Sequence, residues 1–187
     1  MKKSSLLLYV GIITLLVVPL ISATPRENAS RQYIPRRVDE IYVSVEEKKL
    51  TTKHRGRVVA RYPISTGLDT APTPRGEFEI INKLENPWYT PADEPAQPPN
   101  SEENPIGTRW LGINKPSYGI HGTNEPESIG RAASDGCIRL HNRHVEMLYD
   151  RVEPGTKVYI KDRIPGELAE KEPLVSPPEP ILADSGE

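Results

Sequence analysis

The middle of the chain alternates between apolar and polar residues in short runs. In "EIYVSVEEKKL", Ile41, Val43 and Val45 occupy every second position. A period of two places these side chains on one face of an extended strand, so the segment predicts a half-buried β-strand. Similar patterns predict strands at 58–65, after a turn at 54–56, and in "GEFEII" and "GTKVYI", with shorter strand-like pieces in "YGIHG" and "CIRL".

One segment has the spacing of a helix instead. In "HNRHVEMLYDRV", apolar residues recur at helical intervals, at Val145, Leu148, Tyr149 and Val152. Asn142 precedes them in the position of an N-terminal cap. One short helix among several strands predicts a mostly β fold of the β-rich α+β class.

Prolines interrupt these patterns in one long segment. The chain has 20 prolines, and six of them lie in "NPWYTPADEPAQPPNSEENP". Proline lacks the N–H that a central strand or a helix interior needs, so the segment predicts a long loop inside the domain. Long loops in compact domains often act as lids or binding loops. Trp88 and Tyr89, at its start, either line a cleft or cover an edge of the core.

The N-terminus has the pattern of a targeting segment. Positive residues at 2–3 precede an apolar run from Leu6 to Ile21, and Ser22 and Ala23 are small enough for cleavage. The run suits a cleaved signal peptide, and it is also just long enough for an uncleaved membrane anchor. With no cysteine near the cleavage region, a lipoprotein is excluded. Either form predicts an extracytoplasmic domain, in the periplasm or cell wall, with membrane contact only through an uncleaved segment.

The chain therefore divides into four parts. We expect a signal peptide or anchor at 1–23, a polar linker at 24–37, one folded domain at 38–163, and a disordered tail rich in proline and glutamate at 164–187. Lys and Arg total 24 against 26 Asp and Glu, a net charge of −2. This balance lacks the basic surface of nucleic-acid-binding proteins, so we expect no nucleic-acid partner.

Cys137 is the only cysteine in 187 residues. Exported proteins usually pair their cysteines, so a lone thiol is a buried apolar group, an intermolecular bridge or a reactive group. A reactive cysteine attacks as a thiolate and needs a base or a positive environment. Gly136 gives the backbone room to turn amides toward a substrate oxygen. Arg139 lies on the same side of a strand as the thiol, where a guanidinium can bind a carboxylate.

The four histidines are the candidate bases. His121 ends the strand-like "YGIHG", and Gly122 after it permits close approach. His54 lies in a charged turn and His144 in the helical segment, so both are expected at the surface. His141 lies just after "CIRL".

A zinc site made by Cys137, His141 and His144 is a further alternative. Their spacing, Cys-x3-His-x2-His, is not one of the usual zinc patterns, and the sequence offers no obvious fourth ligand. We therefore expect no metal and no cofactor.

The segment "YGIHGTN…IGRAASDGCIRL" resembles the active-site signature of L,D-transpeptidase catalytic domains, the YkuD-like family. That signature is a strand ending in His-Gly, a loop of about a dozen residues, and Ser-x-Gly-Cys-x-Arg. "YPISTGLDTAPTPRGEFEI", "NPIGTRWLGI" and "LYDRVEPGTKVYI" resemble other family segments in the same order. The resemblance covers nearly all of the predicted domain. It implies a mixed β-sheet or sandwich, with a short helix after the catalytic loop and the proline-rich loop over the cleft.

The resemblance also implies a reaction on bacterial peptidoglycan. Cys137 would attack a tetrapeptide stem between its L- and D-centres, His121 would act as base and then acid, and amides near Gly136 would hold the oxyanion. Terminal D-alanine would leave, and an amine on a neighbouring stem would resolve the thioester into a cross-link. We expect this protein to act as a monomer. The residues expected to contact substrate or shape its site are Arg139, Ser134, Gly122, Trp88 and Tyr89.

One position departs from the family pattern, and it leaves the rate and the thiol pKa open. Many members have histidine where this chain has Asp135, so the base role rests on His121, and Asp135 is expected to face solvent. Two other functions remain alternatives. One is an L,D-carboxypeptidase or another peptidoglycan hydrolase, in which water replaces the amine. The other is a non-catalytic wall-binding module.

Overall fold

The computed structural model describes residues 37–93 and 95–166. The expected targeting segment at 1–23 lies outside them, as do most of the linker and the tail. Within the described part of the chain, no helix is long and apolar enough to cross a membrane.

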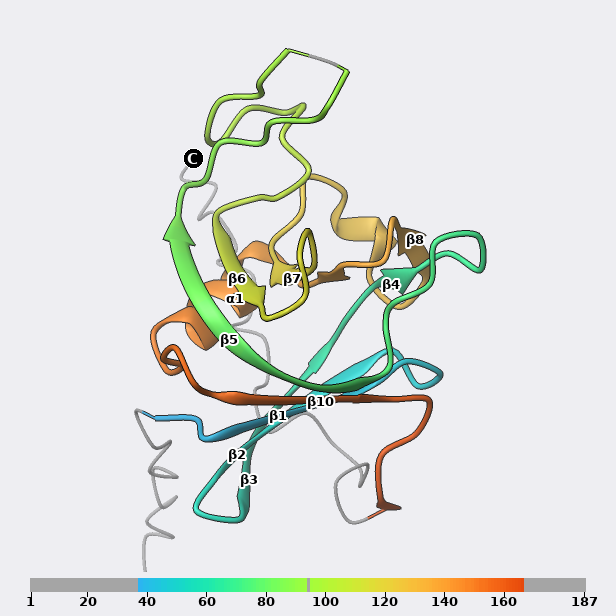
Figure 1. Cartoon of the computed structure of the whole chain (residues 1–187), viewed down its shortest axis with the longest axis vertical. Helices are drawn as coiled ribbons and strands as arrows, with labels where there is room; N and C mark the ends of the chain where they lie inside the picture. Colours follow the sequence, from blue (N-terminus) through green and yellow to red (C-terminus); the bar gives the residue numbers. More distant parts are fainter. Residues whose placement is uncertain (1–36, 94, 167–187) are drawn as a thin grey trace, which may run out of the picture. The chain divides into compact units, whose positions relative to one another are not determined.

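Strands dominate the described residues (Figure 1). In chain order the elements are β1 (Glu40–Ser44), β2 (Lys49–His54), β3 (Arg57–Pro63), β4 (Thr66–Gly67), β5 (Gly76–Glu85), β6 (Arg109–Ile113), β7 (Gly119–His121), the short 3-10 helix η1 (Pro126–Ser128), β8 (Ala132–Ser134), β9 (Ile138–Arg139), α1 (Asn142–Tyr149) and β10 (Lys157–Lys161). Among the described residues, eight strands form a sheet in the order β3-β2-β1-β10-β5-β6-β7-β9, and β4 pairs with β8 separately.

The long strand β5 makes this sheet curl. Its first residues, from Gly76 to Glu79, pair with β10, and its later residues, from Ile80 to Glu85, pair with β6. The register shifts between Ile80 and Asn82, and such irregularities bend a strand. Figure 1 shows β5 as a long arc between the β10 and β6 sides of the sheet. The sheet is mixed, because β1–β10 and β7–β9 pair in parallel and the other pairs are antiparallel.

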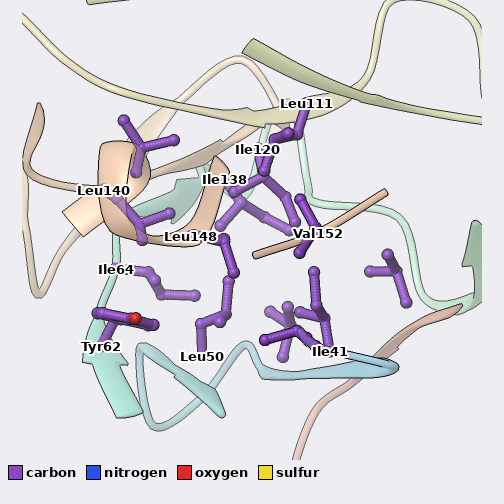
Figure 2. Packing of buried hydrophobic residues seen from close by; sticks show 14 of the residues in the cluster. Ile41, Leu50, Tyr62, Ile64, Leu111, Ile120, Ile138, Leu140, Leu148 and Val152 are labelled. Atoms are coloured by element: carbon purple, nitrogen blue, oxygen red, sulfur yellow. The ribbon is translucent and has the colours of Figure 1, made fainter. Parts of the chain in front are cut away.

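The core fills the concave side of the sheet beneath α1. Figure 2 shows Leu140, Leu148 and Val152 packed above Leu50 and Ile41, and all five side chains are fully buried. The helix packs mainly against β6 and then β7. Burial of a Leu or Ile side chain contributes about 1.5–3 kcal/mol, so these residues hold the helix against the strands that carry the site.

The mostly β prediction with one helix is confirmed. Alternation correctly predicts β1, β5 and β10, and the segment 58–65 corresponds to β3. The turn at 54–56 joins β2 to β3, with Arg55 and Gly56 at positive φ. Four strands of the described chain were not predicted: β2, β4, β6 and β8.

The proline-rich segment is a long loop between β5 and β6, and it is drawn at the top of Figure 1. The buried side chain of Asn104 holds it together from inside. Its Nδ2 donates to the carbonyls of Pro87 (2.9 Å) and Pro98 (3.1 Å), and its Oδ1 accepts from the Ile106 amide (3.0 Å). The loop therefore has internal hydrogen bonds of its own where proline excludes a strand ladder.

Candidate active site

Two neighbouring strands bring His121 and Cys137 together. β7 and β9 pair in parallel, with Ile120 opposite Ile138 and His121 opposite Arg139. Cys137 immediately precedes β9, and the Leu140 amide donates to the His121 carbonyl at 2.8 Å. Sixteen residues of chain separate the thiol from the imidazole, and this pairing closes that distance.

Both side chains line one pocket of about 460 Å³. Its walls come from the end of β5, the proline-rich loop, β6, the turn before β7, and the segment around Cys137. The lining residues are Leu84, Pro87, Trp88, Tyr89, Pro105, Ile106, Trp110, Ser117, His121, Ser134, Asp135, Cys137 and Arg139. A pocket of this size accommodates a segment of a small ligand or peptide.

His121 is buried and holds a defined tautomer. Its Nδ1 lies 2.7 Å from the Gly122 carbonyl oxygen. Because a carbonyl oxygen only accepts, the proton of the neutral ring belongs on Nδ1, and the lone pair is on Nε2. Burial is the main cause that lowers the His121 pKa to about 4; hydrogen bonds to the backbone of Gly122 and Ile106 oppose it, and the positive charge of Arg139 acts in the same direction as burial. At neutral pH the ring is therefore uncharged.

Trp110 fixes the plane of that ring from the neighbouring strand. It lies opposite His121 in the β6–β7 ladder, and the two rings stack with centroids 5.7 Å apart and planes inclined by 22°. The indole Nε1 donates to Asn82 Oδ1 on β5 at 3.1 Å. Gly119 leaves space for the indole, since a Cβ there would lie 2.7 Å from Trp110. The arrangement restricts rotation of the imidazole within the pocket.

The thiol of Cys137 is half-buried and protonated at rest. Its Sγ lies 3.6 Å from the Ser117 carbonyl oxygen, a geometry in which the S–H donates. Burial is the largest influence and raises the thiol pKa, whereas the Gly119 amide and the Arg139 charge lower it and Asp135 raises it further. The resting pair is thus a neutral thiol beside a neutral imidazole, which requires proton transfer during attack.

Ser134 braces the backbone that carries the cysteine. Its hydroxyl donates to the Cys137 carbonyl at 2.6 Å and accepts from the Gly136 amide at 3.3 Å. Gly136 has φ +104°, and a Cβ there would lie 2.7 Å from the Tyr118 ring. Glycine is therefore required at this turn. The Gly136 amide, which we expected to face a substrate oxygen, donates to Ser134 in this structure.

Gly122 allows a second bracing contact, made by Asn142. The Asn142 Oδ1 accepts from the amides of Thr108 (3.3 Å) and Thr123 (3.0 Å), and its Nδ2 donates to the Thr123 carbonyl (3.0 Å). A Cβ on Gly122 would overlap Asn142 Oδ1. The prediction that Asn142 caps the helix was wrong: His141 is the N-cap residue, without a side-chain cap, and Asn142 ties the loop after His121 to the loop before β6.

The other predicted site residues also reach the pocket. Trp88, 63% exposed, and Tyr89, half-buried, line it from the proline-rich loop. Arg139 lines it from β9, with its Nη1 paired to Glu125 Oε2 at 2.7 Å. Asp135 lines it too and is exposed. Gly136 and Gly122 are not lining residues and act through the backbone they shape.

The remaining histidines lie elsewhere. His54 contacts Asp39 Oδ2 through Nδ1 at 3.1 Å, and its side chain is 21% exposed. The expectation that His144 lies at the surface was wrong, because it is 6% exposed and its ring packs 5.3 Å from that of Tyr62. Although His141 and His144 are in contact, no group of three or more His, Cys, Asp or Glu residues in the described chain forms a metal-binding cluster. The zinc alternative thus gains no support from the geometry.

Most of the described chain matches a known family. Residues 39–160 match the YkuD family of L,D-transpeptidase catalytic domains. The chain belongs to this family. It is 44% identical to the putative L,D-transpeptidase YkuD of Bacillus licheniformis over 64% of each chain. It is 37% identical to the putative L,D-transpeptidase YqjB of Bacillus subtilis over 69% of each chain.

A solved structure agrees with the fold. An L,D-transpeptidase of Enterococcus faecium, solved as a cysteine-to-serine variant, is similar with a TM-score of 0.56 and 25% identity. The match covers 67% of this chain and 50% of that one. The chain spans just under two thirds, 64%, of the length of the Bacillus licheniformis relative.

Sequence reasoning missed three residues that organise the site: Trp110, Asn142 in its bracing role, and Glu125. Trp110 stands opposite His121 only through the register of β6 and β7. Asn142 and Glu125 act through contacts 14 to 34 residues away in the chain. No local pattern carries such information, although Trp110 stands inside "NPIGTRWLGI", one of the segments that resemble the family.

Proposed function

We propose that this chain is a cysteine-dependent L,D-transpeptidase that acts on the tetrapeptide stems of peptidoglycan. The observation that carries the proposal is the neutral pair in one pocket: the Cys137 thiol and a His121 ring whose proton is on Nδ1. In this state the lone pair of the ring is on Nε2, the atom that we propose takes the thiol proton. Membership of the family supplies the substrate class.

In the first step, Sγ of Cys137 attacks the carbonyl between the L-centre and the terminal D-alanine. Nε2 of His121 takes the thiol proton and then gives it to the leaving amine of D-alanine, so the C–N bond breaks as the C–S bond of a thioester forms. The imidazolium exists only between these transfers. The lowered pKa of His121 makes it a strong proton donor to the leaving amine.

The tetrahedral oxyanion needs backbone donors near the thiol. We assign this role to the Cys137 amide, with the Gly136 amide joining when it releases Ser134. Ser134 supports the turn in either state, because its hydroxyl also donates to the Cys137 carbonyl. The Gly136 conformation at φ +104° directs both peptide units.

Different walls of the pocket bind different parts of the stem peptide. Arg139 binds a carboxylate, and Trp88 and Tyr89 cover the apolar part of the stem from the loop. Gly122 allows the backbone after His121 to lie close to Asn142. In the second step, the amine of a neighbouring stem attacks the thioester, its proton passes to His121, and Cys137 is released as the thiol.

Incubation of the purified protein with tetrapeptide-stem muropeptides tests this function. Mass analysis is expected to show dimers with a new cross-link and free D-alanine. Trimmed monomers alone would indicate an L,D-carboxypeptidase, which shares the acyl-enzyme and uses water. Unchanged substrate would indicate a wall-binding module and would overturn the enzymatic proposal.

The remaining proposals concern the whole chain. The family acts on the cell wall, and the N-terminal pattern at 1–23 supports an extracytoplasmic location, as a secreted or anchored protein. The linker at 24–37, the catalytic domain at 38–163 and the tail at 164–187 complete this organisation. We also propose that the protein acts as a monomer.

A further inference from the structure

The guanidinium of Arg139 is held at one corner by Glu125. The Arg139 side chain is 12% exposed, and its Nη1 lies 2.7 Å from Glu125 Oε2. The backbone of Arg139 is fixed on both sides, because its amide and carbonyl bond to Ser65 at 3.0 and 2.9 Å and it pairs with His121 in the β7–β9 ladder. Only the position of the guanidinium end therefore depends on Glu125.

The rest of the guanidinium is not fully used. Nε is closed off from solvent and has no hydrogen-bond partner among the described residues. A ligand in the pocket therefore meets the Nη end of the group. Each Nη atom carries two hydrogens, and Glu125 engages Nη1 alone. Enough donors remain at this end for a carboxylate to bind with two parallel hydrogen bonds.

The structure also fixes the place of Glu125. Its amide donates to Thr123 Oγ1 at 2.9 Å, and its carbonyl accepts from the Ser128 amide at 2.9 Å. Thr123 in turn is bound on both backbone polar groups by Asn142. The carboxylate thus extends from a pinned backbone toward Arg139, while the side chain is 54% exposed.

Stability alone accounts poorly for this arrangement. Ion pairs with an exposed partner contribute little to folding, and a buried donor left without a partner is unfavourable. Arg139 is nevertheless placed at the wall of the pocket that contains Cys137. A ligand bound at the Nη end explains why an arginine is held at the pocket wall by an ion pair that contributes little to folding.

We propose that Glu125 is a positioning residue: it holds Nη1 of Arg139 so that the Nη end faces the pocket and binds the terminal carboxylate of the donor stem, that of the leaving D-alanine. The inference rests on the proposed function for the identity of that ligand. Glu125 itself does not touch the substrate. It sets the preference for donors with a free terminal carboxylate over donors in which that group is an amide.

Binding to an inactive background tests the proposal without turnover. In Cys137→Ala protein, isothermal titration would compare a tetrapeptide ending in D-alanine with the same peptide ending in D-alaninamide. A lost charge-assisted pair typically weakens binding about tenfold or more, so we expect the acid to bind about tenfold more tightly. Adding Glu125→Ala is expected to reduce this ratio to about threefold or less. Glu125→Gln should retain most of the ratio, because its amide oxygen still accepts from Nη1.

Glu127 offers a matched control. It lies two residues further on in η1, is exposed, and takes part in no ion pair within the part of the chain that the structure describes. Glu127→Ala is expected to leave the acid-to-amide ratio unchanged, which separates the contact from a general loss of negative charge.

Three results would overturn the inference. They are an unchanged ratio in Glu125→Ala, a larger ratio, which would show that Glu125 competes with the ligand, and the absence of any preference for the acid in the Cys137→Ala background. Failure of the proposed function appears separately, as the absence of turnover in the protein with Cys137 intact. The binding ratio tests the role of Glu125 in either case.

Discussion

The indole of Trp110 stacks on the imidazole of His121, with centroids 5.7 Å apart and planes inclined by 22°. The Gly122 carbonyl holds the same imidazole through Nδ1, at 2.7 Å. One contact defines the plane of the ring and the other defines its rotation within that plane. Together they aim Nε2, and a base aimed in advance loses less entropy when the transition state forms.

Removal of the indole should therefore cost rate with little loss of substrate binding. We expect Trp110→Ala to lower the acylation rate about 10- to 100-fold, part of the ~10²–10⁴-fold that a positioned general base contributes. Trp110→Phe should retain more activity because a smaller ring still stacks. Stopped-flow acylation, with thermal melting to confirm folding, measures this. A parent-like rate in Trp110→Ala would show that the Gly122 contact suffices.

The nucleophile is tested by a covalent adduct. Members of the family are typically sensitive to carbapenems, and a poised thiol opens such strained rings. Intact-mass spectrometry should show one adduct on the parent and none on Cys137→Ala, which is expected to abolish turnover and keep the fold. Cys137→Ser should be nearly inactive, since a hydroxyl is far less acidic than a thiol. An adduct that persists in Cys137→Ala would place acylation at another residue.

The pH dependence follows from the burial of His121. A histidine with an ordinary pKa near ~6.5 would give a rate that rises through that pH. Burial lowers the His121 pKa to about 4, and only the uncharged ring accepts the thiol proton. The acylation rate should therefore rise around pH 4 and retain about nine tenths of its plateau at pH 5. Since burial raises the Cys137 pKa, free thiolate adds a second rise only in alkaline solution. Half-maximal acylation near pH 6.5 would contradict this assignment.

The free energy of unfolding should also change between pH 6.5 and 4, so the pH profile of the rate needs a measurement of folding as its control. The unfolded chain protonates His121 near ~6.5, whereas the folded chain does so only around pH 4. Below pH 6.5 the unfolded state binds more protons, so the free energy of unfolding falls as the pH is lowered toward 4. Circular dichroism at each pH separates loss of fold from loss of rate.

Gly122 and Asn142 should behave as a coupled pair. In the parent, Gly122→Ala places a methyl group against Asn142 Oδ1 and should destabilise the protein by roughly 1–3 kcal/mol. Asn142→Ala removes that obstacle, although it also leaves the Thr108 and Thr123 amides without their acceptor. Urea denaturation of the two single variants and the double variant should give a coupling energy of about 1 kcal/mol. Additive effects would mean that the loop moves away from the clash.

A strand could be predicted from the sequence where its buried residues lie on one face and its polar residues on the other. In β1, Ile41 and Val43 are buried on either side of the half-buried Tyr42, and in β10 the buried Val158 and Ile160 alternate with exposed or half-buried neighbours. β6, with the sequence "RWLGI", has no clear alternation because Leu111 to Ile113 are all buried. Its pairing with β5 and β7 decides its conformation, and pairing between distant segments has no local signature.

The site residues also divide into those that a local motif predicts and those that only tertiary contacts determine. Cys137, His121 and Arg139 could be proposed together because their neighbours form a recognisable motif, and all three line one pocket. The surface prediction for His144 considered only that the residue lies in a helix and not which face it occupies. His144 lies four residues before the buried Leu148 and therefore on the same, buried face of α1. The local sequence pattern predicts Asn142 as the helix cap. In the structure its side chain instead makes three hydrogen bonds to Thr108 and Thr123, which are distant in the chain.

The loop held by Asn104 can vary in sequence without disturbing the strands on either side of it. Its internal bonds join Pro87, Pro98 and Ile106 to one asparagine, so the register of β5 against β6 does not depend on the residues at its tip. Surface loops tolerate insertions at small thermodynamic cost. Trp88 and Tyr89 thus belong to an exchangeable module, whereas Cys137 and His121 belong to a fixed one. On the proposed function, a grafted loop would change which stem peptide binds, while Cys137 and His121 keep their positions at the β7–β9 pair.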